Sequence, residues 1–568
     1  ALREESDKVF ESSGVIGWHT YMQMRESELL SKDTTGKDLA VLERLRAGAR
    51  DIAQGSLDAT TWGDNKNRVF AWLESIMQDV HAAPRRVPRR CRLFTVGQRG
   101  DYQKSIRPAA QALHMCETHP ESLHEHRESL GASDFYWGEQ WDRMEQYVRT
   151  PIRKTAIVGS ILGFMKSMGD KMALARLFAD CMEDVQGAND THHHLVNLGW
   201  CEFTKRGFNL GRQGKMLRGQ HHQFREWAQS IRGDNQFPQL WILKAQKSFN
   251  QVGISMLHLE EADASDDDAV LRWMKRAVPD GTWTLQEYVQ NPTLFVDRKF
   301  DMRVWAVISS IDPLRIVICR KFMPKISTKR YSPSVATKKD SCMHFKMPMG
   351  PECSKALLVK PYPAHTAMAT FYRGLRFAHP VFDAAEAWNR LVVPQVERIV
   401  SLVTLLARAE PLELHHEMRR AGAVYRRFLM LSPDFIVDNK GRVYLEEMNT
   451  NGFMPGDDVL YKTQKDTEAL LHLLGADGFP KRPEYESRVR QLLEEFCAPR
   501  DDCSDENKAS IYELVDEEVH AFPSSWYRAY PSLFTDEHEE LQGIKPSEFV
   551  TPGDAFLRDF LRFRAQHI

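Results

Sequence analysis

Three oxygen-bearing side chains near residue 440 have the types and spacing of a magnesium site. Asp434 lies in an apolar run typical of a strand, and residues 439–441 (Asn-Lys-Gly) predict a tight turn into a returning strand at 442–446. Glu447 and Asn449 are two residues apart, so on an extended chain their side chains point to the same face. Carboxylate and amide oxygens are the ligands that Mg²⁺ takes when phosphates complete its coordination. The alternative is a surface hairpin whose acidic residues are only solvated, and the pattern alone leaves both open.

Charged side chains on earlier predicted strands could contact the phosphates of a nucleotide. Lys244 ends the apolar run 238–244 just before a predicted turn, where a lysine acts as a compact point charge. Lys299, Asp301 and Arg303 alternate with apolar residues, so they share one face of a predicted strand. Burying these three charges is costly unless they pair or bind a ligand. A structural ladder of ion pairs is therefore the alternative.

Size and composition exclude several classes of protein. With 568 residues, the chain predicts about three or four domain-sized units. Its apolar fraction of 42% and charged fraction of 27% are typical of a soluble globular protein, and a formal net charge of −2 gives no overall attraction to nucleic acid. The longest apolar run, 156–164, is far shorter than the roughly 20 residues of a membrane span, and no secretory signal opens the chain. Nine scattered cysteines without a Cys-x-x-Cys pair favour reduced thiols over a disulfide framework or a zinc site.

The order of the predicted elements favours an α/β protein. Residues 1–84 have the pattern of polar helices. A strand at 93–96, a helix at 102–114 and a strand near 134–137 then form a βαβ unit, an ordinary opening for an α/β domain. Further along, the lysine- and arginine-rich stretch 321–346 could grip an acidic polymer or could be a solvated loop.

Five motifs in this order resemble the tubulin tyrosine ligase-like family. They are Trp-Ile-Leu-Lys at 241–244, Leu-Gln-Glu-Tyr-Val at 285–289, Arg-Lys-Phe-Asp-Met-Arg at 298–303, Arg320, and Asp434-Phe435 with Glu447-Met448-Asn449. The likeness extends over residues 93–474. It implies an α/β (α+β) chain with an ATP-grasp fold, an N-terminal α/β domain and helical extensions at both ends. The domains expected are a helical N-terminal extension, the N-terminal α/β domain, a central ATP-grasp domain, a C-terminal ATP-grasp domain carrying the metal site and a C-terminal helical extension, at 1–84, 85–200, 201–292, 293–480 and 481–568.

The resemblance also implies a ligase that uses ATP and Mg²⁺ to add an amino acid to a carboxylate of a tubulin C-terminal tail. ATP phosphorylates the carboxylate, and the amine then attacks the acyl phosphate to form an amide. Glutamate is favoured as the added amino acid, followed by glycine or tyrosine. The implied partners are tubulin or microtubules and a free amino acid, without nucleic acid or a membrane span, in the cytoplasm, the cytoskeleton or a cilium. The alternatives are a catalytically degenerate microtubule-binding scaffold of the same fold and a ligase for a non-tubulin peptide.

The resemblance assigns roles to individual residues. Those expected to contact the nucleotide are Lys244, Gly253, Gln286, Glu287, Tyr288, Val289, Lys299 and Asp301. Those expected to hold the metal are Asp434, Glu447 and Asn449, and those expected to act in catalysis are Arg303, Arg320 and Glu447. Arg320 would pair with the carboxylate of the incoming amino acid, and Lys462 would contact the side chain of a glutamate donor.

Two departures from the family pattern concern nucleotide binding. Asn250 and Gln251 replace a basic residue and a glycine in the loop after Lys244, so fewer backbone N–H groups can approach a phosphate there. Residues 342–347 (Cys-Met-His-Phe-Lys-Met) replace a His-Leu-Thr-Asn element, so its threonine and asparagine are missing. The metal ligands and both arginines are retained. The sequence therefore favours an active but divergent enzyme over an inactive one.

Overall fold

The chain divides into two compact units, Ala1–Gln78 with Leu561–Ile568, and Asp79–Phe560. In the first unit, the guanidinium of Arg564 lies over the ring of Trp72, 5.5 Å from its centroid. Gly253, Lys462, Lys338, Lys339 and most of the expected N-terminal extension lie outside the described residues. The computed structural model describes residues 68–69, 71–76, 78, 91–96, 100–118, 133–137, 157–159, 163–187, 201–210, 240–246, 254–258, 272–273, 276, 281–327, 329–334, 340–344, 375–376, 388–420, 422, 426–450, 452, 454, 464–477, 482–521, 524–531 and 550–568.

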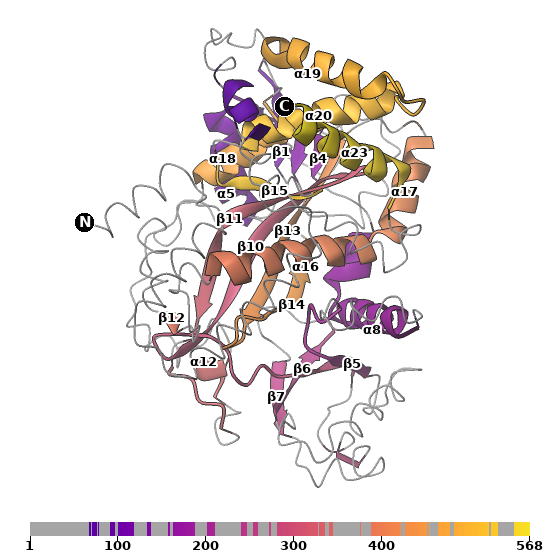
Figure 1. The fold of residues 1–568 in the computed structure, drawn as a ribbon. Helices are drawn as coiled ribbons and strands as arrows, with labels where there is room; N and C mark the ends of the chain where they lie inside the picture. The colour runs from indigo at the N-terminus through magenta and orange to yellow at the C-terminus, as the bar shows by residue number, and fades with distance from the viewer. Residues whose placement is uncertain are drawn as a thin grey trace, which may run out of the picture. The chain divides into compact units, whose positions relative to one another are not determined.

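The described strands of the second unit form two sheets (Figure 1). The larger, eleven-stranded sheet has the order β12-β9-β10-β13-β4-β3-β1-β2, with β11 also on β10, β14 on β13 and β15 on β11. Its strands are β1 (Leu93–Val96), β2 (Cys116–Glu117), β3 (Phe135–Trp137), β4 (Ile157–Gly159), β9 (Leu294–Phe295), β10 (Arg298–Ile311), β11 (Leu314–Ile326), β12 (Leu375–Arg376), β13 (Arg426–Val437), β14 (Val443–Asn449) and β15 (Trp526–Tyr530). The smaller sheet is antiparallel in the order β5-β8-β6-β7, with strands β5 (Gly207–Leu210), β6 (Leu240–Ala245), β7 (Ile254–His258) and β8 (Trp283–Glu287). The expected α/β class is confirmed.

The larger sheet has a hydrophobic core on each face. Along β10, Val304 and Ala306 belong to one core and Trp305 and Val307 to the other, as the two-residue period of a strand requires. A strand that is buried on both faces has a nearly continuous apolar sequence. The same rule explains the apolar run of β13, which pairs with β4 in parallel at its start and with β10 in antiparallel further on. β13 thus joins the N-terminal parallel strands to the strands that carry the candidate residues.

Helices cover both faces of this sheet. The apolar side of α16 supplies Val396, Ile399 and Val403 to one core and lies across the sheet in Figure 1, while α5 and α18 supply Ile106 and Leu470 to the other. The described helices are α5 (Gly100–Ala112), η1 (Met165–Gly169), α8 (Lys171–Gly187), α12 (Ser341–His344), η6 (Trp388–Val392), α16 (Val393–Leu406), α17 (Ala409–Arg420), α18 (Gln464–Leu473), α19 (Arg482–Cys497), α20 (Asp505–Ala521) and α23 (Pro552–His567).

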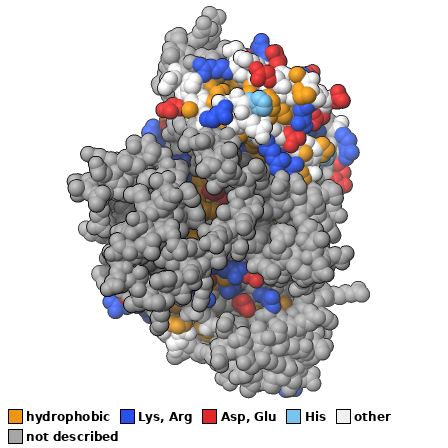
Figure 2. All heavy atoms as spheres, viewed as in Figure 1, with side chains coloured by type: hydrophobic (Ala, Val, Ile, Leu, Met, Phe, Trp, Pro, Cys, Tyr) orange, Lys and Arg blue, Asp and Glu red, His pale blue; other side chains and the backbone are white. Residues whose placement is uncertain are grey.

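The C-terminal helices have a surface of mixed charge. Figure 2 shows basic and acidic side chains interspersed over this region, and exposed ion pairs such as Arg490–Glu486 at 2.7 Å occur there. In the part of the chain that the structure describes, no helix combines the length and the apolar character needed to cross a bilayer.

The cysteines contradict the expectation of reduced thiols. Disulfides join Cys91 to Cys116, Cys181 to Cys201 and Cys497 to Cys503, while Cys319 is a buried free thiol. The partners are 25, 20 and 6 residues apart. None of these spacings resembles a known cysteine motif, and pairing cannot be deduced from spacing without a fold. The tertiary structure brings together the partners of the first two pairs, whereas Cys497 and Cys503 are close along the chain at the end of α19.

A glycine beyond the candidate metal residues allows close contact between two chain segments. Gly452 donates its backbone N–H to Met430 O at 3.1 Å, and a Cβ placed on it would overlap Ser432 Oγ and lie 2.9 Å from the carbonyl carbon of Leu431. We expect Gly452→Ala to lower the free energy of unfolding by about 1–3 kcal/mol in urea titrations, because the neighbouring backbone has to move. Gly207→Ala is the control, since the nearest atom to its Cβ would be 3.6 Å away. Equal stability of the two variants would contradict the close packing.

Candidate functional site

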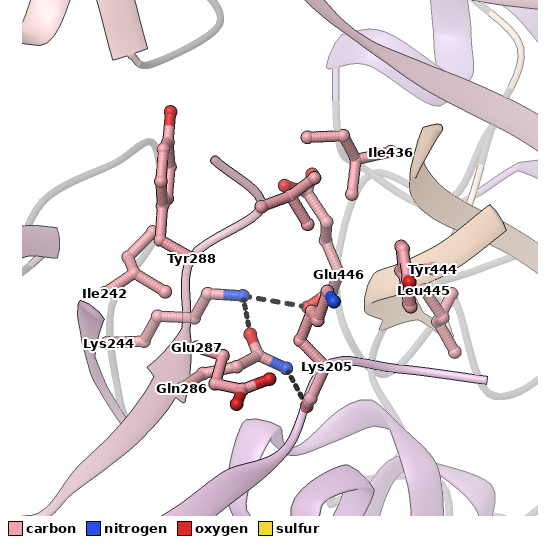
Figure 3. A pocket seen from close by; sticks show the side chains of 11 residues that line it. Lys205, Ile242, Lys244, Gln286, Glu287, Tyr288, Ile436, Tyr444, Leu445 and Glu446 are labelled. Carbon is pink, nitrogen blue, oxygen red and sulfur yellow. Dashed lines mark hydrogen bonds between the residues drawn. The ribbon is translucent and has the colours of Figure 1, made fainter. Parts of the chain in front are cut away.

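A pocket of about 310 Å³ lies where the smaller sheet meets β14 (Figure 3). This volume includes space that is open to solvent. The residues that line it are Lys205, Ile242, Lys244, Gln286, Glu287, Tyr288, Val289, Ile436, Tyr444, Leu445 and Glu446. Five of the residues expected to contact a nucleotide, Lys244 and the four at 286–289, are therefore brought together around one cavity.

Lys244 is held at this pocket by two acceptors. Its Nζ donates to Gln286 Oε1 at 2.8 Å and to the backbone oxygen of Glu446 at 3.1 Å. The amide of Gln286 in turn donates through Nε2 to Thr204 Oγ1 at 2.8 Å and to Lys205 O at 2.9 Å. A buried cation fixed by oriented acceptors can meet an anionic ligand with little rearrangement.

The rest of the pocket combines apolar walls with an aromatic ring. Ile242 and Ile436 come from different sheets and point into the cavity in Figure 3. Lys205 Nζ lies 4.3 Å from the centroid of the Tyr444 ring, a cation–π contact. Burial raises the pKa of Glu287, against the attraction of Lys205 and Arg206. An apolar cleft with a few fixed polar groups suits a flat heteroaromatic ring such as a nucleobase.

The side chain of Tyr288 turns away from the cavity and binds another segment. Its Oη lies 3.0 Å from His344 Nδ1, and the His344 ring is edge-on to both Tyr288 and Tyr331. Tyr331 Oη donates to Gln290 O at 2.8 Å. His344 belongs to the segment that replaces the expected His-Leu-Thr-Asn element. In this chain its side chain fastens α12 to the end of β8.

A cluster of buried charges lies on β10, β11 and β13. Lys299 Nζ is 2.8 Å from Asp301 Oδ1, and both side chains are almost fully buried. Asp434, whose side chain is 1% exposed, receives two bonds from Arg303, at 2.9 and 2.8 Å, and two from Lys325 Nζ, also at 2.9 and 2.8 Å. The sequence left open a ladder of ion pairs or a ligand site, and the structure shows the ion pairs.

Two cations therefore share one carboxylate. Burial opposes the charge of Arg303, but Asp434 and Glu447 outweigh it and raise the pKa of the guanidinium. Burial lowers the pKa of Lys325, against the attraction of Asp434, and Arg303 adds to the lowering. Lys299 likewise has a pKa lowered by burial, against the attraction of Glu446. Such closely packed cations would gain from a further anion.

Asp434, Glu447 and Asn449 lie side by side on the β13–β14 hairpin. Asp434 pairs with Glu447 across the strands, and Asn449 Nδ2 donates to Glu447 Oε1 at 3.0 Å and to Ser432 O at 3.1 Å. The side chain of Glu447 is 35% exposed, whereas that of Asp434 is buried. Within the described ranges, no group of three or more His, Cys, Asp or Glu residues is arranged to hold a metal. A Mg²⁺ site here would consist of two carboxylates and the Asn449 amide oxygen, which is a suitable donor set. Asp434 could join it only when Arg303 or Lys325 moves to another anion.

Arg320 and Lys325 of β11 lie in different surroundings. Arg320 is exposed, lies over the ring of Tyr527 at 5.5 Å and donates its backbone N–H to Ser525 O, so the structure does not bring it to the Asp434 cluster. Lys325, which the sequence analysis placed only in the basic stretch, occupies the cluster instead. It pairs with Asp301 across β10 and β11, which puts both side chains on one face. The register-shifted pairing of these strands places it there, and no pattern within β11 alone indicates it.

Three lysines of the basic stretch 321–346 that the structure describes are paired with acidic residues. Lys321 pairs with Asp466 at 2.7 Å, Lys329 with Asp340 at 2.7 Å, and Lys325 with Asp434. Neither alternative left open for this stretch applies to Lys325, which is buried against Asp434. Lys325 is therefore not available to bind an acidic polymer.

The pocket and the charge cluster lie within a region that matches a known family. The model of the tubulin-tyrosine ligase family matches residues 177–466, just over half of the chain. The chain is 22% identical over 327 residues to the tubulin polyglutamylase TTLL13 of Homo sapiens, which covers 54% of this chain and 39% of that protein. It is 23% identical over 351 residues to the protein monoglycylase TTLL8 of Homo sapiens, which covers 58% of this chain and 36% of that protein. The match thus spans less than half the length of these relatives. The chain belongs to the tubulin-tyrosine ligase family.

Proposed function

We propose that this chain is an ATP- and Mg²⁺-dependent ligase with an ATP-grasp fold that adds an amino acid to the C-terminal tail of tubulin. The observation that carries the proposal is the position of the Lys244 pocket directly beside the charge cluster. Residues 444–446 of β14 line the pocket, and Glu447 and Asn449, at the end of the same strand, belong to the cluster. A nucleotide with its base in the pocket would therefore extend its phosphates toward the buried cations.

The chain's own residues account for nucleotide binding in this proposal. The base would lie between Ile242 and Ile436, with backbone groups of 286–289 at its edge. Lys244 and Lys299 would contact phosphate oxygens as point charges. Asp434, Glu447 and Asn449 would hold Mg²⁺, which when bound supplies charge neutralisation for the phosphates.

Arg303 and Lys325 would act in catalysis once a phosphoryl group is bound beside them. In the structure they neutralise Asp434. With a nucleotide, a phosphoryl group offers them a second anion, and a partial shift of these cations would free oxygen atoms of Asp434. The same cations would then stabilise the charge on the phosphoryl group during its transfer.

The proposed reaction has two steps. An oxygen of the tail carboxylate attacks the γ-phosphate and forms an acyl phosphate, while ADP leaves. The amine of the amino acid then attacks the acyl carbon, phosphate leaves, the nitrogen loses a proton, and an amide bond remains. The activities named for two relatives, polyglutamylation and monoglycylation, support glutamate as the first candidate and glycine as the next, with tyrosine as the remaining candidate. The cytoskeleton or a cilium is the corresponding location.

A catalytically degenerate microtubule-binding scaffold is the second candidate. The observation that favours it is the changed segment around His344, whose side chain is engaged with Tyr288 and Tyr331. A scaffold would keep the fold without Mg²⁺-dependent nucleotide binding.

Labelled amino acids separate the two candidates. We expect the full chain, incubated with tubulin, ATP and Mg²⁺, to incorporate labelled glutamate more than labelled glycine or tyrosine. Omission of ATP or Mg²⁺, or removal of the tubulin tails, should abolish the signal. No incorporation, together with no Mg²⁺-dependent ATP binding by calorimetry, would support the scaffold. Incorporation into a non-tubulin peptide but not into tubulin would show that tubulin is not the acceptor.

A further inference from the structure

One wall of the pocket is a short segment, Cys201–Arg206, that is neither helix nor strand; we call it the wall segment. Hydrogen bonds tie it to both sheets. Phe203 O accepts from Leu445 N of β14 at 2.6 Å, and Arg206 O accepts from Glu287 N of β8 at 2.9 Å. A segment of this kind has no ladder of its own, so its position depends on these bonds and on its anchor points.

The wall segment controls the group that holds Lys244. Thr204 Oγ1 donates to Leu445 O at 2.7 Å and accepts from Gln286 Nε2 at 2.8 Å. Lys205 O accepts from the same Nε2 at 2.9 Å. Since the Oε1 atom of this amide accepts from Lys244 Nζ, a shift of the wall segment would turn the amide and remove one acceptor of the lysine. Lys205 also contributes its side chain to the pocket.

A disulfide anchors the first residue of the wall segment. Cys201 is bonded to Cys181 of α8, both cysteines are buried, and Leu406 packs against the pair. Phe178 of the same helix packs edge-on against Phe203, with 5.9 Å between the ring centroids. Phe178 and Phe203 belong to the main hydrophobic core. The disulfide therefore ties the pocket wall to a helix that is packed against the core.

We propose that the Cys181–Cys201 disulfide is a positioning element of the nucleotide pocket. It fixes the wall segment so that Thr204 and Lys205 hold the Gln286 amide, and its loss weakens nucleotide binding beyond any effect on the fold. This inference rests on the proposed function, because it takes the pocket to be the nucleotide site. The Cys497–Cys503 disulfide provides a comparison, since it joins neighbouring residues beside α19 and neither cysteine lines the pocket.

The test compares two disulfide deletions in the full chain. Mass spectrometry first establishes the two disulfides in the wild type; free Cys181 and Cys201 would overturn the proposal. Calorimetry with a non-hydrolysable ATP analogue and Mg²⁺ then gives the Kd below the unfolding midpoints of all variants. We expect Cys181→Ala with Cys201→Ala to raise the Kd by at least about tenfold, a size typical of lost support around a binding group. Cys497→Ala with Cys503→Ala should leave the Kd within about twofold, whatever it does to the midpoint.

A second background shows whether the disulfide acts through the wall segment. If it does, removing it from a Gln286→Met variant should raise the Kd by less than about threefold, because the amide that links the wall segment to Lys244 is already lost. Fully additive effects, or equal weakening by both disulfide deletions, would overturn the proposal. If the wild type and the variant without the Cys181–Cys201 disulfide bind the analogue equally well, this inference is overturned and the proposed function stands. A wild type that binds no nucleotide overturns the proposed function as well.

Discussion

Glu447→Gln is expected to lower the rate of amino-acid incorporation by about 10²–10³-fold and to leave the fold intact. The substitution removes the negative charge of the most accessible carboxylate in the cluster. It keeps the shape of the side chain, and the new amide oxygen can still accept from Asn449 Nδ2. The measurement is the initial rate of labelled glutamate incorporation at saturating ATP, with urea unfolding in parallel.

Glu486→Gln is the matched control for this substitution. Its side chain is 37% exposed, close to the 35% of Glu447, and it pairs with Arg490 at 2.7 Å on α19. We expect its rate to stay within about twofold of the wild type, because exposed ion pairs contribute little. An unchanged rate in Glu447→Gln would remove this residue from the catalytic site. A large loss of stability in Glu447→Gln would instead show a structural role.

Asp434 is a less informative target, although it lies at the centre of the cluster. It accepts four hydrogen bonds from Arg303 and Lys325. Removing one partner of a buried ion pair leaves uncompensated charge and typically costs about 3–5 kcal/mol. A substitution at Asp434 would therefore mix unfolding with any loss of chemistry. The side chain of Glu447 is partly exposed and accepts a hydrogen bond from the neutral amide of Asn449, so its substitution separates the loss of chemistry from unfolding.

Local patterns were sufficient to predict part of the site. The strand at 93–96 was predicted with its observed bounds, and the hairpin around 439–441 is confirmed by the pairing of β13 with β14. The shared face of Glu447 and Asn449 followed from the two-residue period of a strand, because nothing interrupts β14 between them. The observed bond between these two side chains agrees with that placement.

Features that depend on pairing between distant segments were missed. Lys325 faces Asp301 only because β10 and β11 pair with register shifts, and such irregularities cannot be read from a single strand. The Cys91–Cys116 and Cys181–Cys201 disulfides depend on tertiary contacts in the same way. The C-terminal extension was expected to be helical, yet its residues 526–530 form β15, which pairs with β11 about two hundred residues earlier in the chain. That pairing places Tyr527 under Arg320 and explains why this arginine faces away from the cluster.

Asp554→Ala is expected to destabilise the fold by about 3–5 kcal/mol, a large share of the roughly 5–15 kcal/mol typical of a domain. Asp554 is buried in the first turn of α23, where its carboxylate accepts from Leu314 N at 2.6 Å and from Thr551 N at 2.9 Å. It also pairs with Arg408, which is buried and donates to Ile311 O. The substitution would leave this guanidinium without its carboxylate and would loosen the turn between β10 and β11, the strands that carry Arg303 and Lys325.

Asp559→Ala on the same helix is the control for Asp554→Ala. Its side chain is 37% exposed and pairs with Arg500 at 3.1 Å, so we expect a loss of less than about 1 kcal/mol in urea titrations. Combining Asp554→Leu with Arg408→Met then identifies the cause. If uncompensated charge dominates, this apolar pair should recover much of the stability that the single variant loses. If the double variant is as unstable as Asp554→Ala, the lost stability comes mainly from the hydrogen bonds to Leu314 N and Ile311 O. Each of the two variants lacks at least one of these bonds. If Asp554→Ala and Asp559→Ala lose the same free energy of unfolding, the buried contacts of Asp554 do not stabilise the β10–β11 hairpin.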